Sequence, residues 1–236
     1  MHDTPIDNAQ RFYARLAGFM YLVNYAASVF GSLAPASIRG SGDFTEQARR
    51  TIASVQLYRT ALTSMAIGWV LIVFLAFSLY ITLKPVNKRL AQLALFLELC
   101  QASIGAVTGI FSFAVLGLYT TRSFQSEQLE SLARVVESAD VSGFNISMMF
   151  LAVGSTIFFY LFYQSRYIPR PLAAWGVFAS VVMLMVSMAM LLFPEHIRTL
   201  QYGWGPIGIA ELGTALWLAI IGIRPAPARL GQLSTA

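Results

Sequence analysis

Polar and apolar residues fall into long blocks along this chain. Six apolar runs each reach the length at which a helix can cross about 30 Å of hydrocarbon, and short polar segments separate them. The predicted spans cover residues 16–36, 60–83, 90–119, 144–165, 171–193 and 204–223. The pattern predicts an all-α, polytopic membrane protein, built as one integral membrane domain over residues 1–236 with a six-helix transmembrane bundle.

Two of the connecting segments are long and show helical spacing of their apolar residues. The first predicts an amphipathic helix over about 43–58, with Asp43 and Glu46 spaced as in a capping box. The second predicts one over about 126–140. We expect both to lie at the lipid headgroups or to cover the bundle, and the alternative is a pair of mobile helices that gate an outward opening.

Charge supports the membrane assignment and predicts the orientation. The chain is 57% hydrophobic and 11% charged, against about 25% charged in soluble domains. If both termini are cytoplasmic, nine Lys and Arg lie on the inner side in short loops with only Asp3 and Asp7, and seven lie outside with seven acids. The positive-inside rule therefore predicts cytoplasmic termini, and it explains the net charge of +5 without a nucleic-acid partner.

Several kinds of chemistry lack the residues they need. Cys100 is the single cysteine, His2 and His196 are the only histidines, and Lys84 and Lys88 are the only lysines. Thiolate or histidine-rich metal sites, bis-histidine haem ligation and a mid-membrane Schiff base are therefore excluded within one chain. No metalloprotease, nucleophile-elbow, P-loop or dinucleotide-binding motif is present. The sequence predicts no catalytic residue, no metal and no cofactor.

Two glutamates are the only charged residues inside the spans. A carboxylate at the bilayer centre costs about 2.5–3.5 kcal/mol, so such residues usually face the interior of a bundle. On the third span, Glu98 shares a helical face with Gln101, Gly105 and Gly109, and the two glycines form a small-xxx-small pair that favours close approach of another helix. Glu98 and Glu211 are therefore both expected to point inward.

The candidate binding residues are Glu98, Glu211, Asn24, Tyr25 and Gln101, because all are polar and lie near mid-membrane depth. The leading hypothesis is a non-catalytic protein that holds a lipid-like or small amphiphilic ligand in an interior polar pocket. One alternative is interhelical hydrogen bonding, in which a protonated glutamate donates to Asn24 or Gln101. The others are a proton-coupled transporter that uses Glu98 and Glu211 and an intramembrane lipid-modifying enzyme with the same two carboxyls as acid and base.

Several stretches of the chain resemble a known family. They are Tyr58 to Leu62, Leu79 to Lys88, the Leu97-Glu98 pair, Tyr163 to Arg170, and Glu211 with Ala215 to Leu218. Together they resemble the bacterial family named domain of unknown function 4386. The resemblance implies six spans in a bacterial inner membrane, and it implies no activity.

Overall fold

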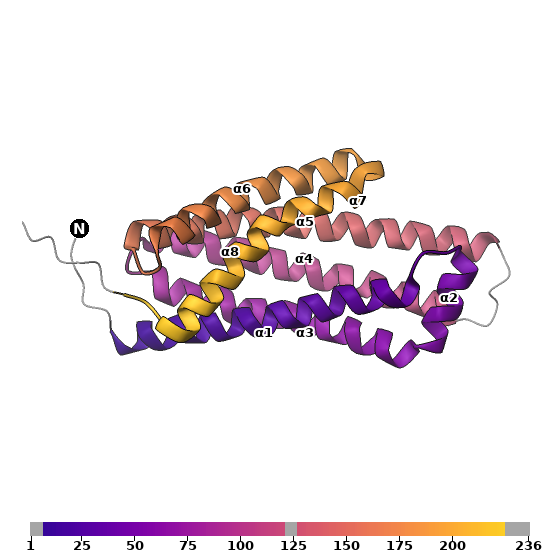
Figure 1. Ribbon diagram of the computed structural model, residues 1–236, viewed down its shortest axis with the longest axis horizontal. Coiled ribbons are helices and arrows are strands. Elements are labelled where there is room, and N and C mark those ends of the chain that lie inside the picture. The colour runs from indigo at the N-terminus through magenta and orange to yellow at the C-terminus, as the bar shows by residue number, and fades with distance from the viewer. Residues whose placement is uncertain (1–6, 121–126, 225–236) are drawn as a thin grey trace, which may run out of the picture.

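The fold is all helical over the described residues, 7–120 and 127–224, of the computed structural model (Figure 1). Its helices are α1 (Asn8–Arg39), α2 (Phe44–Ala53), α3 (Val55–Leu83), α4 (Lys88–Thr120), α5 (Glu127–Ser165), α6 (Arg170–Leu192), η1 (Pro194–His196), α7 (Ile197–Leu200), η2 (Gln201–Trp204), α8 (Gly205–Leu216) and the π-helix η3 (Trp217–Ile221). Within this part of the chain, six helices are long and apolar enough to cross a membrane, the sixth running from Pro194 to Ile221. The prediction of a six-helix all-α bundle is confirmed.

The six long helices form a closed ring in chain order. α1 packs on α3, α3 on α4, α4 on α5, α5 on α6 and α6 on α8, and α8 returns to pack on α1. The first residue of α1 and the end of η3 lie at one end of the bundle, here called the Asn8 end, and α2 lies at the other, the α2 end (Figure 1). A ring of this kind brings residues of the first and last spans beside each other around one interior.

The second outer helix is not a separate element. An outer helix was predicted over 126–140; its described residues, 127–140, are helical, but they form the first part of α5, which continues without a break to Ser165. No proline interrupts this stretch, and a single glycine costs a helix only about 1 kcal/mol. Gly143, near the expected break, instead leaves room for the Thr108 side chain of α4. α5 therefore carries one continuous face from the α2 end to the Asn8 end.

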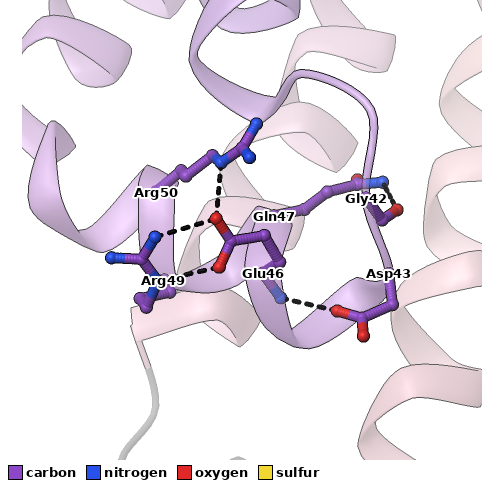
Figure 2. A network of polar contacts seen from close by, with 6 residues as sticks. All are labelled: Gly42, Asp43, Glu46, Gln47, Arg49 and Arg50. Atoms are coloured by element: carbon purple, nitrogen blue, oxygen red, sulfur yellow. Dashed lines mark hydrogen bonds and ion pairs between the residues drawn. The ribbon is translucent and has the colours of Figure 1, made fainter.

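The first outer helix is shorter than predicted. α2 ends at Ala53, and after the non-helical residue Ser54 the residues 55–58 belong to α3. Asp43 caps α2 as predicted, since its carboxylate accepts the backbone N–H of Glu46 at 2.8 Å (Figure 2). Glu46 does not complete the capping box, because its carboxylate pairs with Arg49 and Arg50. Hydrogen bonds from these two guanidinium groups lower the pKa of Glu46 to about 2.

Packing is dense at the Asn8 end. Gln10 is buried and donates from Nε2 to the Thr82 carbonyl at 2.8 Å and to the Tyr167 hydroxyl at 2.9 Å. The largest group of buried apolar residues lies in this half and includes Ala14, Leu79 and Leu83. The interior is therefore closed toward the Asn8 end, and the cavities described below lie deeper in the bundle and toward α2.

Candidate functional site

A cavity of about 400 Å³ lies inside the ring. All six long helices contribute to its wall: α1 through Tyr21, Asn24, Tyr25, Ser28, Val29 and Ser32; α3 through Met65, Trp69, Ile72, Leu75, Ala76 and Leu79; α4 through Glu98 and Gln101; α5 through Phe144, Met148 and Leu151; α6 through Met183; and the sixth span through Trp204, Ile207, Gly208 and Glu211. The wall is mostly apolar, and the described residues that form it include a few polar groups and no basic side chain. We call it the central cavity.

The central cavity brings together all five residues that were chosen from the sequence. Glu98 and Gln101 come from α4, Asn24 and Tyr25 from α1, and Glu211 from α8. α1 meets α8 only because the ring closes, so this proximity depends on the tertiary fold. Their common location agrees with the predicted pocket, and their role in binding stays a prediction.

Glu98 is held against α5 by two small residues. It is 6% exposed, and its Oε1 accepts a long hydrogen bond from the Ser155 hydroxyl at 3.4 Å. A Cβ atom on Gly154 would lie 2.8 Å from the same Oε1, so a larger residue there would force the carboxyl to move. The buried carboxyl therefore has one weak protein donor and unused hydrogen-bonding capacity.

Two amide oxygens in this region have no hydrogen-bond partner. Asn24 Oδ1 and Gln101 Oε1 are both inaccessible to solvent, and no described residue donates to either. A buried polar atom without a partner costs about 1–3 kcal/mol, so native structures usually satisfy it. No hydrogen bond joins Glu98 or Glu211 to Asn24 or Gln101, and the interhelical bonding predicted as one alternative is therefore not the observed arrangement.

The glycine pair on α4 serves a different purpose from the one predicted. A Cβ on Gly105 would meet the indole ring of Trp69 at 2.6 Å, whereas a Cβ on Gly109 would meet nothing within 4 Å. The atoms nearest to a Cβ on Gly105 belong to a side chain and no described atom lies near a Cβ on Gly109, so the glycine pair does not make the close backbone contact that was expected. The missing side chains instead leave room for Trp69 and for open space beside α4.

Close helix contact occurs at another glycine, on α1. A Cβ on Gly18 would overlap the Ala219 backbone nitrogen and would lie 2.8 Å from the Ala215 carbonyl oxygen. Toward the α2 end, a Cβ on Gly208 would lie 3.6 Å from the Tyr25 hydroxyl, which is ordinary contact. Tyr25, Val29 and Ser32 are exposed on the bundle and also line the central cavity. The cavity therefore reaches the bundle surface along α1.

Several cavity residues were not predicted from the sequence, although one group of them has a recognisable pattern. Tyr21, Ser28 and Ser32 were missed, although they share one helical face with the predicted Tyr25, at offsets of −4, 3 and 7 residues from it. This polar stripe on an apolar span identifies the wall contributed by α1. Trp69, from α3, had no such signal, because tryptophan is equally common at membrane interfaces and in packed interiors.

The geometry defines a class of protein: a six-helix polytopic membrane protein whose ring of helices encloses a cavity with two carboxyls and two unpartnered amide oxygens. Among the described residues, no group of three His, Cys, Asp or Glu side chains is placed to hold a metal ion. The chain belongs to the family described as Domain of unknown function (DUF4386), which matches residues 16–222. No curated protein and no solved structure matches the chain.

Proposed function

We propose that this protein is a non-catalytic membrane protein that holds a lipid-like or other small amphiphilic molecule in the central cavity. The observation that carries the proposal is the pair of buried, unpartnered oxygens, Asn24 Oδ1 and Gln101 Oε1, beside the wall that contains Glu98 and Glu211. A ligand head with hydroxyl or amine donors would satisfy them once the amide groups rotate toward the cavity, since neither oxygen is open to solvent in the structure. Without such a ligand, the chain bears the cost of leaving them unsatisfied.

Shape and polarity of the cavity favour an amphiphile. Apart from its few polar groups, the wall consists of apolar side chains such as Leu75, Leu79 and Met183, which suit a hydrocarbon chain. Since a water molecule takes about 30 Å³ in the liquid, the space holds roughly a dozen non-hydrogen atoms. That volume fits a polar head and the first part of one chain, and the rest of the molecule would leave through the opening along α1.

The test is native mass spectrometry of the detergent-purified protein. We expect a co-purifying species on the wild-type chain that is lost or reduced in Glu98→Gln and in Glu211→Gln, because each substitution removes one carboxyl from the wall. Glu127→Gln is the matched control, since Glu127 is exposed at the start of α5 and does not line the cavity. The melting temperature of each variant is measured in parallel.

The outcome separates binding from packing. If the bound species disappears from the two cavity variants while their melting temperatures stay near that of Glu127→Gln, the glutamates form a binding site. If the wild-type chain carries no species and both cavity variants are merely less stable, the proposal fails and the glutamates are structural.

We further propose that the Asn8 end of the bundle is cytoplasmic. The loops after α3 and α5 are short and contain Lys84, Arg166 and their basic neighbours, which the positive-inside rule assigns to the cytoplasm. In a Cys100→Ala background, an impermeant maleimide added to intact cells should label Ser41→Cys, in the loop before α2, and not Asn87→Cys, in the loop before α4. Labelling of Asn87→Cys alone would reverse the orientation.

A further inference from the structure

A second cavity of about 320 Å³ adjoins the central cavity on the side of the α2 end. The two share the aromatic side chains Trp69, Phe144 and Trp204 as part of their walls. The second cavity contains a different set of polar groups, among them Arg39, Glu137 and Asp140. We call it the outer cavity, and none of its charged residues lines the central one.

Each of the two carboxylates in the outer cavity accepts hydrogen bonds from the described residues through only one of its two oxygens. Glu137 Oε1 accepts both the Tyr119 hydroxyl at 2.8 Å and Arg39 Nη1 at 3.3 Å. Asp140 Oδ2 accepts the Ser112 hydroxyl at 2.6 Å. No described residue donates to Glu137 Oε2 or to Asp140 Oδ1. Each carboxylate is thus positioned through one oxygen and retains the other as a free acceptor.

A third acceptor comes from Asn145, one turn further along α5. Asn145 is 3% exposed, and its Nδ2 donates to the Val141 carbonyl at 2.9 Å, which identifies Oδ1 as the remaining atom of the amide. Oδ1 is buried and has no donor among the described residues. Since Asn145 also lines the outer cavity, a buried amide oxygen without a donor lies beside this space.

The charges around the outer cavity favour a cation. Among the described residues of its wall, the charged ones are Arg39, Glu137 and Asp140, which together carry a net charge of −1 when both carboxyls are ionised, in a chain whose net charge is +5. The rest of the wall is largely apolar and aromatic, with Leu62, Met65 and the shared tryptophans. A space that would hold roughly ten water molecules is too large for a bare metal ion and suits an organic cation.

We infer that the outer cavity binds a primary ammonium group attached to an apolar body, with its N–H donors directed at Asp140, Glu137 and Asn145. A primary ammonium has three donors, which matches the three free acceptors in number, and a single positive charge, which matches the net charge of the wall. The aromatic walls would contact the apolar body and attract the cation. This inference goes beyond the proposed function, because it concerns a separate cavity and a different ligand chemistry.

The test uses 2-phenylethylamine as the probe, with full-length protein in dodecyl maltoside at pH 7.5 and isothermal titration calorimetry as the measurement. We expect saturable binding of one molecule per chain, weakened about tenfold or more by Asp140→Asn or Asn145→Leu, since each removes a hydrogen-bond acceptor from a charged donor. Asp43→Asn is the matched control: it removes the same charge near the same end, keeps a good cap for α2, and does not line the cavity.

Ligand analogues test the same inference without altering the fold. 2-Phenylethanol lacks the charge and the trimethylammonium analogue of the probe lacks N–H donors, so both should bind at least about tenfold more weakly. Equal binding of the trimethylammonium analogue, or no saturable binding of 2-phenylethylamine to the wild-type chain, would overturn the inference. Glu98→Gln should leave the affinity for the probe unchanged, which separates this result from any failure of the central cavity to hold an amphiphile.

Competition then identifies the source of the ammonium group. Displacement of the probe by phosphatidylethanolamine but not by phosphatidylcholine supports a lipid headgroup as the natural ligand. Displacement by neither supports a soluble amine. Equal displacement by both lipids would contradict recognition through N–H donors.

Discussion

Gly18→Leu is expected to abolish folding of this protein, and Gly18→Ala to destabilise it by about 1–3 kcal/mol, the usual cost of forcing extra atoms into a packed contact. The reason is the crossing of α1 and the end of the sixth span, where a Cβ on Gly18 would overlap the Ala219 backbone and lie 2.8 Å from backbone atoms of Ala215 and Leu218. Backbone atoms cannot rotate out of the way as a side chain can. The two helices would have to separate, and the ring would open between its first and last members.

The matched control for Gly18 is Gly109→Ala, because it makes the same change within a spanning helix where a Cβ meets nothing within 4 Å. Alanine is favoured over glycine in a helix by about 0.5–1 kcal/mol, so this variant should be as stable as the wild type or slightly more so. Unfolding in sodium dodecyl sulfate, followed by circular dichroism, measures both variants. Equal effects of Gly18→Ala and Gly109→Ala would show that helix crossing at Gly18 does not hold the ring closed.

Gly208→Phe is expected to eliminate the amphiphile from the central cavity while the protein stays folded. Gly208 lines the cavity, and a Cβ there would make ordinary contact with the Tyr25 hydroxyl at 3.6 Å. The backbone therefore accepts a side chain, and the ring of phenylalanine must extend into space that the ligand would use. Native mass spectrometry should show that the species bound to the wild-type chain is lost from this variant.

The control for Gly208 is the neighbouring residue on α8. Ile209 is 65% exposed and does not line the central cavity, so Ile209→Phe adds the same ring on the outside of the same helix. Circular dichroism and the melting temperature establish that both variants are folded. If Gly208→Phe retains the bound species as fully as Ile209→Phe does, the species is not held in the central cavity.

Gly18 and Gly208 together explain how α1 and the sixth span can be in close contact at one level of the bundle and separated at another. At Gly18 the backbones of α1 and the sixth span touch, and at Gly208 the tyrosine of α1 reaches across a wider gap. Exposed residues such as Val29 line the cavity along this seam. The proposed ligand would therefore exchange with the bilayer between the first and last spans.

The candidate residues could be chosen from the sequence because the energetic penalty that identifies them is local. A glutamate inside an apolar run is costly wherever the run lies, so Glu98 and Glu211 were identified without knowledge of their neighbours. Asn24 and Tyr25 were found by depth, which follows from the rise per residue of a helix. The fourth span was harder, because an outer helix predicted over 126–140 and a span predicted over 144–165 are joined in α5, which runs from Glu127 to Ser165 and contacts Thr108 at Gly143.

The sequence by itself determined the number of spans and the inward direction of the two carboxyls, since both follow from the transfer of single residues and single helices into hydrocarbon. Only the tertiary structure decided which helices are neighbours. Lipid and the packed interior are equally apolar, so the hydrophobicity of a helix does not show which of its faces another helix will cover. The helix neighbours are determined by how well the side chains pack. That packing brings α8 against α1 and places Asn24 and Glu211 in one cavity. It also brings the hydrogen-bond acceptors of Asp140, Glu137 and Asn145 together in the outer cavity.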